Sequence, residues 1–151
     1  LKDLIRQIVA ADAGDKYSEM MLSRAMAKAK VVSADLNPGI NPIWPSAWEE
    51  KNAPRLGYGV NLKLYGRGFN ARSEYLAWFR NIMDKGNIPW QTATYKVGKA
   101  GGGTIGSDIS DDNMDVIDIG IPLLSIHTPM SIASKVDIYN FYRTLGAFYA
   151  N

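Results

Sequence analysis

The chain has 151 residues, of which 46% are hydrophobic and 21% charged, a composition typical of one folded domain rather than a disordered segment. Its 17 basic and 15 acidic residues give a net charge of +2 with no basic block, so we expect no nucleic-acid or membrane partner. There is no cysteine, which excludes disulfides and thiolate metal sites. No apolar stretch approaches the roughly 20 residues of a membrane-spanning helix, and we expect a cytoplasmic protein.

Helical and strand patterns alternate along the chain. The predicted elements, in chain order, are helices over 2–11 and 18–29, a strand over 30–35, a proline-rich surface excursion over 36–56, a strand over 57–65, a helix over 73–85, a strand over 89–97, a glycine loop over 98–106, a weak helix over 107–114, strand material over 115–126 and a helix over 134–149. Alternation at this spacing predicts an α/β fold, a sandwich with a largely parallel central sheet.

Two polar residues fall where predicted strands end. Asp35 closes the strand over 30–35, and His127 follows the apolar run that ends at Ile126. Ligands of such sheets bind at the carboxyl ends of the strands, so both residues are candidates for a site. The excursion over 36–56 is a further candidate, because long loops without structure of their own are usually functional.

The last predicted helix carries two sequence signals. Ser134 and Asp137 stand in the register of a capping box at its start. Four residues at helical spacing form one apolar face: Ile138, Tyr142, Leu145 and Tyr149.

The glycine loop raises the possibility of nucleotide binding. Gly101, Gly103 and Gly106 satisfy G-x-G-x-x-G after a predicted strand. The acidic residue expected about 20 positions later is misplaced, because Asp118 comes early, and the acidic segment 107–112 would repel phosphate. No lysine follows the last glycine, so the Walker pattern fails as well. Nucleotide binding is therefore the weaker alternative.

His127 is the only histidine of the chain, and its role is open on the residues alone. A structural histidine is the commoner case, whereas imidazole and carboxylate are also good ligands for zinc. Asp35 and His127 would not suffice for a tight zinc site, which takes three or four protein ligands. Glu49 and Glu50 are predicted to lie in a solvated loop.

Several motifs resemble those of one enzyme family, in the same order and spacing. They are "VVSADLNPGINP", "NAPRLGYGVNLK", "GNIPWQ", "GGGTIG" and "MDVIDIGIPLLSIHTPMSIASKVDIYNFYRTLGAFY". They resemble the aspartyl aminopeptidases, the aminopeptidase-I-like family of dinuclear zinc aminopeptidases, from about residue 20 to the C-terminus. The resemblance implies a three-layer, zinc-exopeptidase-like fold and a metal-dependent aminopeptidase that acts on peptides through two zinc ions.

The resemblance also implies roles for single residues. Asp35 matches the aspartate of the family's S-A-D motif and His127 the histidine of its M-H-S motif, and both are metal ligands in the family. Lys63 matches a lysine that contacts substrate. Gly103 and Thr104 match the glycine-rich turn beside the active centre.

The chain also departs from the family. Pro38 stands where better-known members have a substrate-binding histidine, so a preference for acidic N-terminal residues is in doubt. The family's remaining ligands and its general-base glutamate lie in an earlier portion that this chain does not contain. Residues 1–151 therefore resemble a single domain that is the C-terminal portion of the catalytic domain, without the N-terminal portion and the inserted dimerisation domain. We expect a homo-oligomer; the alternative is a non-catalytic homologue that acts as a scaffold or assembly subunit.

Overall fold

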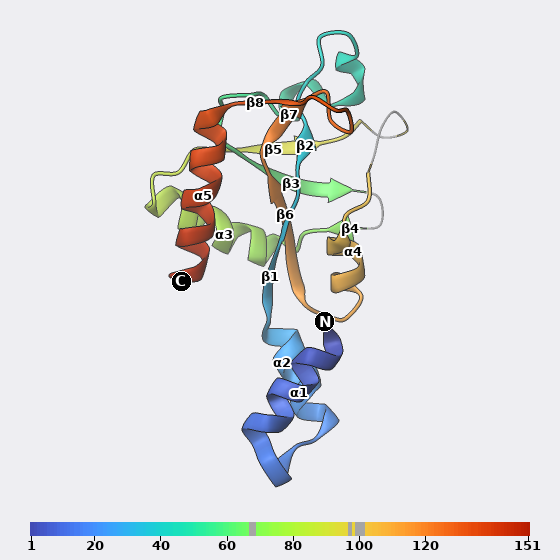
Figure 1. Cartoon of the computed structure of the whole chain (residues 1–151), viewed down its shortest axis with the longest axis vertical. Helices are drawn as coiled ribbons and strands as arrows, with labels where there is room; N and C mark the ends of the chain where they lie inside the picture. Colours follow the sequence, from blue (N-terminus) through green and yellow to red (C-terminus); the bar gives the residue numbers. More distant parts are fainter. Residues whose placement is uncertain (67–68, 97, 99–101) are drawn as a thin grey trace.

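The computed structural model describes residues 1–66, 69–96, 98 and 102–151 (Figure 1). Its helices are α1 (Lys2–Ala13), α2 (Glu19–Lys28), α3 (Ser73–Lys85), α4 (Ile105–Ser110) and α5 (Lys135–Tyr149), with short 3-10 turns η1 (Gly14–Lys16), η2 (Pro45–Ala47) and η3 (Glu50–Asn52). Its strands are β1 (Lys30–Ala34), β2 (Asn37–Pro38), β3 (Val60–Gly66), β4 (Phe69–Asn70), β5 (Trp90–Thr94), β6 (Asp115–Gly120), β7 (Pro122–Leu124) and β8 (Ile132–Ala133).

The central sheet is built around β6 and β3. Strand β1 pairs in parallel with β6, β6 pairs antiparallel with β3, and β3 pairs in parallel with β5. Strand β4 folds back antiparallel on the end of β3. A small second sheet continues beyond the first, with β7 parallel to β2 and antiparallel to β8. The predicted α/β architecture with a parallel-rich sheet is confirmed.

Helices cover both faces of the central sheet. On one face, Val60, Leu62 and Ile117 pack against Phe79 of α3, and Phe148 of α5 adds to this core. On the other face, the aliphatic side chains of β1 and β6 pack against α2 and α4. Burying an aliphatic side chain in such a layer stabilises the fold by about 1.5 to 3 kcal/mol. The result is the predicted three-layer sandwich.

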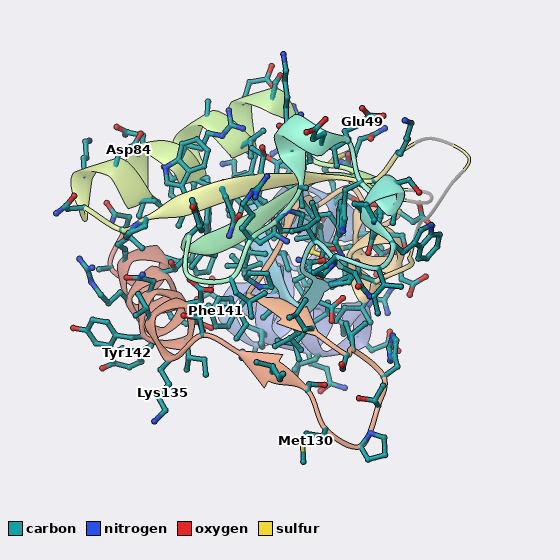
Figure 2. The ribbon with its side chains drawn as sticks, turned by 90° about the horizontal axis from the view of Figure 1, so that it is seen from above. Glu49, Asp84, Met130, Lys135, Phe141 and Tyr142 are labelled. Carbon is teal, nitrogen blue, oxygen red and sulfur yellow. The ribbon has the colours of Figure 1, made fainter. Side chains whose placement is uncertain are left out.

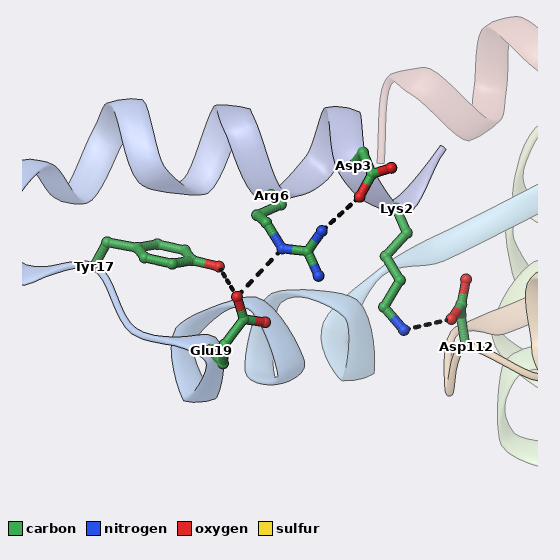
Figure 3. A network of polar contacts seen from close by, with 6 residues as sticks. All are labelled: Lys2, Asp3, Arg6, Tyr17, Glu19 and Asp112. Atoms are coloured by element: carbon green, nitrogen blue, oxygen red, sulfur yellow. Dashed lines mark hydrogen bonds and ion pairs between the residues drawn. The ribbon is translucent and has the colours of Figure 1, made fainter.

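The helices α1 and α2 form a hairpin at one end of the long axis, opposite β2 and β7 (Figure 1). A polar network links them, because Arg6 of α1 donates to Glu19 of α2 at 3.2 Å, and Tyr17 donates to the same carboxylate at 2.7 Å (Figure 3). The hydrogen bond from Tyr17 lowers the pKa of Glu19. Lys2 reaches Asp112, beyond α4, at 2.9 Å. Exposed ion pairs of this kind contribute little stability, so the network orients the hairpin more than it stabilises it.

Helix α5 begins and ends close to the predicted positions but differs from the prediction in two respects. Ser134 is the N-cap residue and makes no side-chain cap bond, so the predicted capping box is wrong. Asp137 instead accepts hydrogen bonds from the backbone N–H groups of Gly57 and Gly59, at 2.6 and 2.8 Å. The long-range contact forms in place of the capping box because one fully buried carboxylate satisfies two N–H groups of the loop before β3.

The predicted apolar face of α5 points mostly outward. Ile138, Tyr142 and Tyr149 are exposed, while Leu145 is half-buried. Figure 2 shows Tyr142 on the outer side of the helix, together with Lys135. The helix rests on the sheet through Phe141 and Phe148, which come from the neighbouring helical rows, and through its buried polar residues.

Other predicted elements are shortened or divided. The strand predicted over 57–65 begins at Val60, because Gly57 and Gly59 adopt φ of 86° and 98°, which a strand does not allow. The strand material over 115–126 divides into β6 and β7, which belong to different sheets. The weak helix predicted over 107–114 is α4, which begins earlier, after Thr104. The excursion over 36–56 is partly structured by β2 and two 3-10 turns.

Candidate functional site

A pocket of about 450 Å³ lies beyond the ends of β1, in the central sheet, and β7, in the small second sheet. Asp35, Lys63, Gly103 and His127, which the sequence singled out, all line this pocket. Thr104 lines an adjoining cavity, which shares Asp35 and Gly103 with the pocket. Four separate stretches of the chain therefore contribute to the pocket and the adjoining cavity, and Asp35 and His127 reach the pocket from positions just after β1 and β7.

Asp35 follows β1 directly and is held by its backbone. Its N–H donates to the carbonyl of Ile119 at 2.9 Å, which extends the pairing of β1 with β6 by one residue. One carboxylate oxygen, Oδ1, accepts from the N–H of Leu36 at 2.7 Å. The side chain is 45% exposed, and its Oδ2 lies 3.8 Å from Nζ of Lys63.

His127 lies in a turn three residues beyond the end of β7 and is exposed. Both His127 and Ser125 adopt left-handed backbone conformations, with φ of 61° and 59°. The turn is held together by hydroxyls, since those of Thr128 and Ser131 lie 2.7 and 2.8 Å from the carbonyl oxygen of Ser125. Left-handed non-glycine residues cost about 1 kcal/mol or more each, and such strain is common at functional sites. The turn directs His127 to the pocket that Asp35 lines.

Lys63 is buried between two carboxylates. Its Nζ lies 3.1 Å from Oδ2 of Asp118 on β6 and 3.8 Å from Oδ2 of Asp35. The side chains of Lys63 and Asp118 are only 5% and 1% exposed, whereas Asp35 faces solvent. With one positive and two negative charges, this trio carries a net charge of −1. The surplus negative charge makes this end of the pocket attractive to a cation.

Aromatic side chains form another wall of the pocket. Trp48 of the excursion stacks on Tyr95, which follows β5, with ring centroids 4.0 Å apart and planes 12° from parallel. The two residues also form an isolated antiparallel bridge. Burial, together with the nearby charge of Asp35, raises the pKa of Tyr95 to about 12. Its hydroxyl is therefore neutral at ordinary pH and presents a polar edge beside Asp35.

The described part of the glycine loop, residue 98 and residues 102–106, shows no recognisable phosphate site. Gly101, one of the three motif glycines, lies outside the described residues. Thr104 caps the short helix α4, and its hydroxyl accepts from the N–H of Gly106 at 3.2 Å. The adjoining cavity is lined by the carboxylates of Asp35 and Asp108, which would repel a phosphate. These contacts give the nucleotide alternative no support.

The donor set fits a divalent metal in part. Asp35 offers a carboxylate and His127 an imidazole on the same pocket, and both are ligands that zinc accepts. Within the described ranges no group of three or more histidine, cysteine, aspartate or glutamate side chains could hold a metal. Glu49 and Glu50 do not supply the missing donors, because both are exposed as predicted, and Figure 2 shows Glu49 on the outer rim of the excursion. Among the described residues the pocket therefore offers two side chains of a type that zinc accepts, fewer than a tight zinc site takes.

Three residues at or near the pocket were not predicted as part of a metal or substrate site: Asn37 and Tyr95, which line the pocket, and Asp118, which pairs with Lys63 behind it. Asp118 was considered only as a nucleotide-binding acid, and nothing in its neighbourhood along the chain shows that it pairs with Lys63. The buried amide of Asn37 lines the pocket and has no hydrogen-bond partner among the described residues. Tyr95 stands at the end of a predicted strand, and this position is the one signal that could have marked it.

Comparison with known proteins identifies relatives over nearly the whole chain. A model of the family described as aminopeptidase I zinc metalloprotease (M18) matches residues 1–149. A probable M18 family aminopeptidase 1 from Borreliella afzelii (strain PKo) is 38% identical over 141 residues, which are 89% of this chain and 31% of that protein. The corresponding protein of Thermotoga maritima is 37% identical over 145 residues, which are 91% of this chain and 32% of that protein.

Solved structures of the same family also match nearly the whole chain. A crystal structure of an M18 family aminopeptidase from Thermotoga maritima has a TM-score of 0.89 and 35% identity, over 97% of this chain and 34% of that one. Aminopeptidase I from Clostridium acetobutylicum has a TM-score of 0.86 and 34% identity, over 99% of this chain and 34% of that one. The chain thus spans about a third of the length of the relatives it matches. No helix among the described residues has the length and apolar character needed to span a membrane.

Proposed function

Since the chain belongs to the aminopeptidase I zinc metalloprotease (M18) family, we propose that it supplies part of the active site of a metal-dependent aminopeptidase, which removes N-terminal residues from peptides. The observation that carries the proposal is the meeting of Asp35, Lys63 and His127 on one pocket. These residues come from three separate stretches of the chain, and each matches a family motif.

Asp35 and His127 are the proposed metal ligands. Asp35 has a 45% exposed side chain whose Oδ1 accepts from a backbone N–H, and His127 is an exposed residue on a turn held by hydroxyl contacts. We propose a centre of two zinc ions, for which further protein donors and a general-base glutamate come from outside residues 1–151. Zinc, when bound, supplies Lewis-acid polarisation of the scissile carbonyl.

Lys63, Gly103 and the aromatic wall are the proposed substrate-binding groups. Lys63 lines the pocket with its ammonium group paired to Asp118, and its remaining N–H donors are proposed to meet a carbonyl oxygen of the peptide. Gly103 lines the pocket beside it and Thr104 the adjoining cavity. Trp48 and Tyr95 provide an apolar surface for a side chain. Pro38 lines the same pocket and offers no positive charge to an acidic N-terminal residue, so an acidic preference is not part of the proposal.

Zinc titration tests the proposed ligands. Residues 1–151 should bind zinc weakly, since a tight site takes three or four protein ligands. His127→Ala should lower the affinity by about tenfold or more, because losing a direct ligand exceeds the 10- to 100-fold loss that neighbouring groups often cause. Its stability should change little, because His127 is exposed. The matched control is Glu49→Gln with Glu50→Gln, which removes two carboxylates away from the pocket and should leave zinc affinity unchanged.

An activity assay completes the test. The chain alone should hydrolyse no aminoacyl substrate at any zinc concentration, because the general-base glutamate is missing. Submicromolar zinc binding with turnover would contradict the partial-site proposal. Unchanged zinc affinity in His127→Ala would show that the histidine is structural. We also propose that the complete enzyme is a homo-oligomer, which light scattering measures directly.

A further inference from the structure

We propose that Asp118 is a positioning residue, which holds Lys63 away from Asp35 and so keeps the Asp35 carboxylate free for a divalent cation. The inference rests on the metal site proposed above. Asp118 itself is not among the residues that line the pocket.

The distances show how Lys63 divides its charge. Its ammonium group makes a hydrogen-bonded ion pair with Asp118 at 3.1 Å, whereas Asp35 lies 3.8 Å away, beyond hydrogen-bond range. Asp118 holds Lys63 more closely than Asp35 does. Without Asp118, Lys63 would have Asp35 as its one carboxylate partner among the ion pairs of the described residues.

Burial explains why Lys63 pairs with Asp118 rather than with Asp35. Strands β3 and β6 place Lys63 directly opposite Asp118, and both side chains are almost completely buried. Charges removed from water interact more strongly than charges that water screens, so the buried pair is persistent. Asp35 is nearly half exposed, and its attraction to Lys63 is screened.

The carboxylate of Asp118 is committed to Lys63. Its Oδ2 pairs with the lysine, while its Oδ1 is buried and has no hydrogen-bond partner among the described residues. No backbone N–H in the described part of the chain donates to it, in contrast to Asp137, which joins two segments through backbone groups. The contacts of Asp118 therefore act on the charge of Lys63 rather than on the chain path.

Charge balance predicts an unusual order of metal affinities. In the wild type the trio of Lys63, Asp118 and Asp35 carries −1, and Asp118→Asn brings it to zero with Lys63 free to bind Asp35. Lys63→Met removes the lysine charge, which brings the trio to −2 if the buried Asp118 stays ionised and leaves it at −1 if Asp118 takes up a proton. The double variant returns the trio to −1 and leaves Asp35 without a competing lysine. A purely structural ion pair predicts instead that the double variant binds metal no better than Asp118→Asn.

The experiment is a titration of residues 1–151 with Co²⁺, followed by its visible absorption, with urea unfolding of each variant as a control for folding. Asp118→Asn should weaken Co²⁺ binding by about tenfold or more, the range found when groups that support metal ligands are removed. Lys63→Met should bind at least as tightly as the wild type. Lys63→Met with Asp118→Asn should recover an affinity within about threefold of the wild type, as its charge balance predicts.

Three results would overturn the inference: wild-type affinity in Asp118→Asn, a double variant as weak as Asp118→Asn, or Lys63→Met weaker than wild type. Where Asp118→Asn fails to fold, the double variant still tests the inference, because Asp118 should be dispensable for Co²⁺ binding once Lys63 is absent. Absence of Co²⁺ binding to the wild-type chain, by contrast, would refute the proposed metal site itself. Normal wild-type binding with unaffected variants would refute the role of Asp118 alone.

Discussion

Gly120 lies against the backbone of Asp35, and we expect Gly120→Ala to destabilise the fold at the candidate site. A Cβ atom added to Gly120 would lie 1.5 Å from the carbonyl oxygen of Asp35 and 2.7 Å from its carbonyl carbon. Cβ atoms essentially never approach another heavy atom within 3.0 Å, so the two segments must separate by about 1.5 Å. Both obstructing atoms belong to the backbone, so a rotamer change cannot relieve the clash.

The cost follows from the hydrogen bonds on either side of this contact. The N–H of Asp35 donates to Ile119 at 2.9 Å, and the N–H of Asn37 donates to Ile121 at 3.2 Å. Separation by 1.5 Å would break both and leave buried polar groups without partners, at about 1 to 3 kcal/mol each. We therefore expect Gly120→Ala to lower the free energy of unfolding by about 3 to 5 kcal/mol, a large part of the 5 to 15 kcal/mol of a typical domain.

Urea unfolding followed by circular dichroism measures this loss. Gly146→Ala is the matched control, since Gly146 lies in α5 with no atom within 4 Å of an added Cβ. The same chemical change should there stabilise the chain by about 0.5 to 1 kcal/mol, because alanine favours the helix. If Gly120→Ala changed the free energy of unfolding by less than about 1 kcal/mol, the close approach of Gly120 and Asp35 would not exist as described.

Asp137→Ala should lower the free energy of unfolding by about 2 to 4 kcal/mol, because it leaves the N–H groups of Gly57 and Gly59 without their buried acceptor. The control is Asp12→Ala at an exposed position, which should change the free energy of unfolding by less than about 0.5 kcal/mol in the same urea assay. The raised pKa of Tyr95 contributes stability that is fully present below the unfolded-state pKa of about 10 and is lost as pH rises through about 12. The wild type should therefore lose about 2 to 3 kcal/mol more than Tyr95→Phe between pH 9 and 12, and equal losses in the two proteins would refute the raised pKa.

Local sequence patterns predicted the elements whose burial follows a simple period. The helix over 73–85 is confirmed as α3, because its apolar spacing matches the face that packs on the sheet. The strand over 30–35 is confirmed as β1, which ends at Ala34. In such elements one face packs against one neighbouring layer, and the period of the apolar residues alone shows which face is buried.

Patterns failed where a distant segment decides the local structure. In α5 the apolar residues Ile138, Tyr142 and Tyr149 satisfy helical spacing, yet the side facing the sheet includes Asp137, Asn140 and Thr144. The loop before β3 needs an acceptor, and Asp137 provides it from 78 residues away. No pattern confined to residues 134–149 contains that requirement.

The candidate site likewise combines residues that local patterns predict with a contact that depends on distant segments. Asp35 and His127 could be predicted as candidates from their positions after apolar runs, and both line the pocket although β1 and β7 belong to different sheets. The pairing of Lys63 with Asp118 spans 55 residues, and it depends on the register of β3 against β6. A shift of that register by one residue would turn Asp118 to the opposite face of the sheet.

The triplet Asp118–Ile119–Gly120 connects the fold to the site in three ways. Asp118 neutralises Lys63, Ile119 packs in the core of the opposite face and accepts from the N–H of Asp35, and Gly120 leaves space for the carbonyl of Asp35. Successive residues of a strand point to opposite faces, so the outer two face the pocket side while the middle one anchors the strand. Displacing β6 would therefore move Asp35 and Lys63 together. In the sequence these residues form an ordinary strand end. Their effect on the site comes from the pairing of β6 with β1 on one side and β3 on the other.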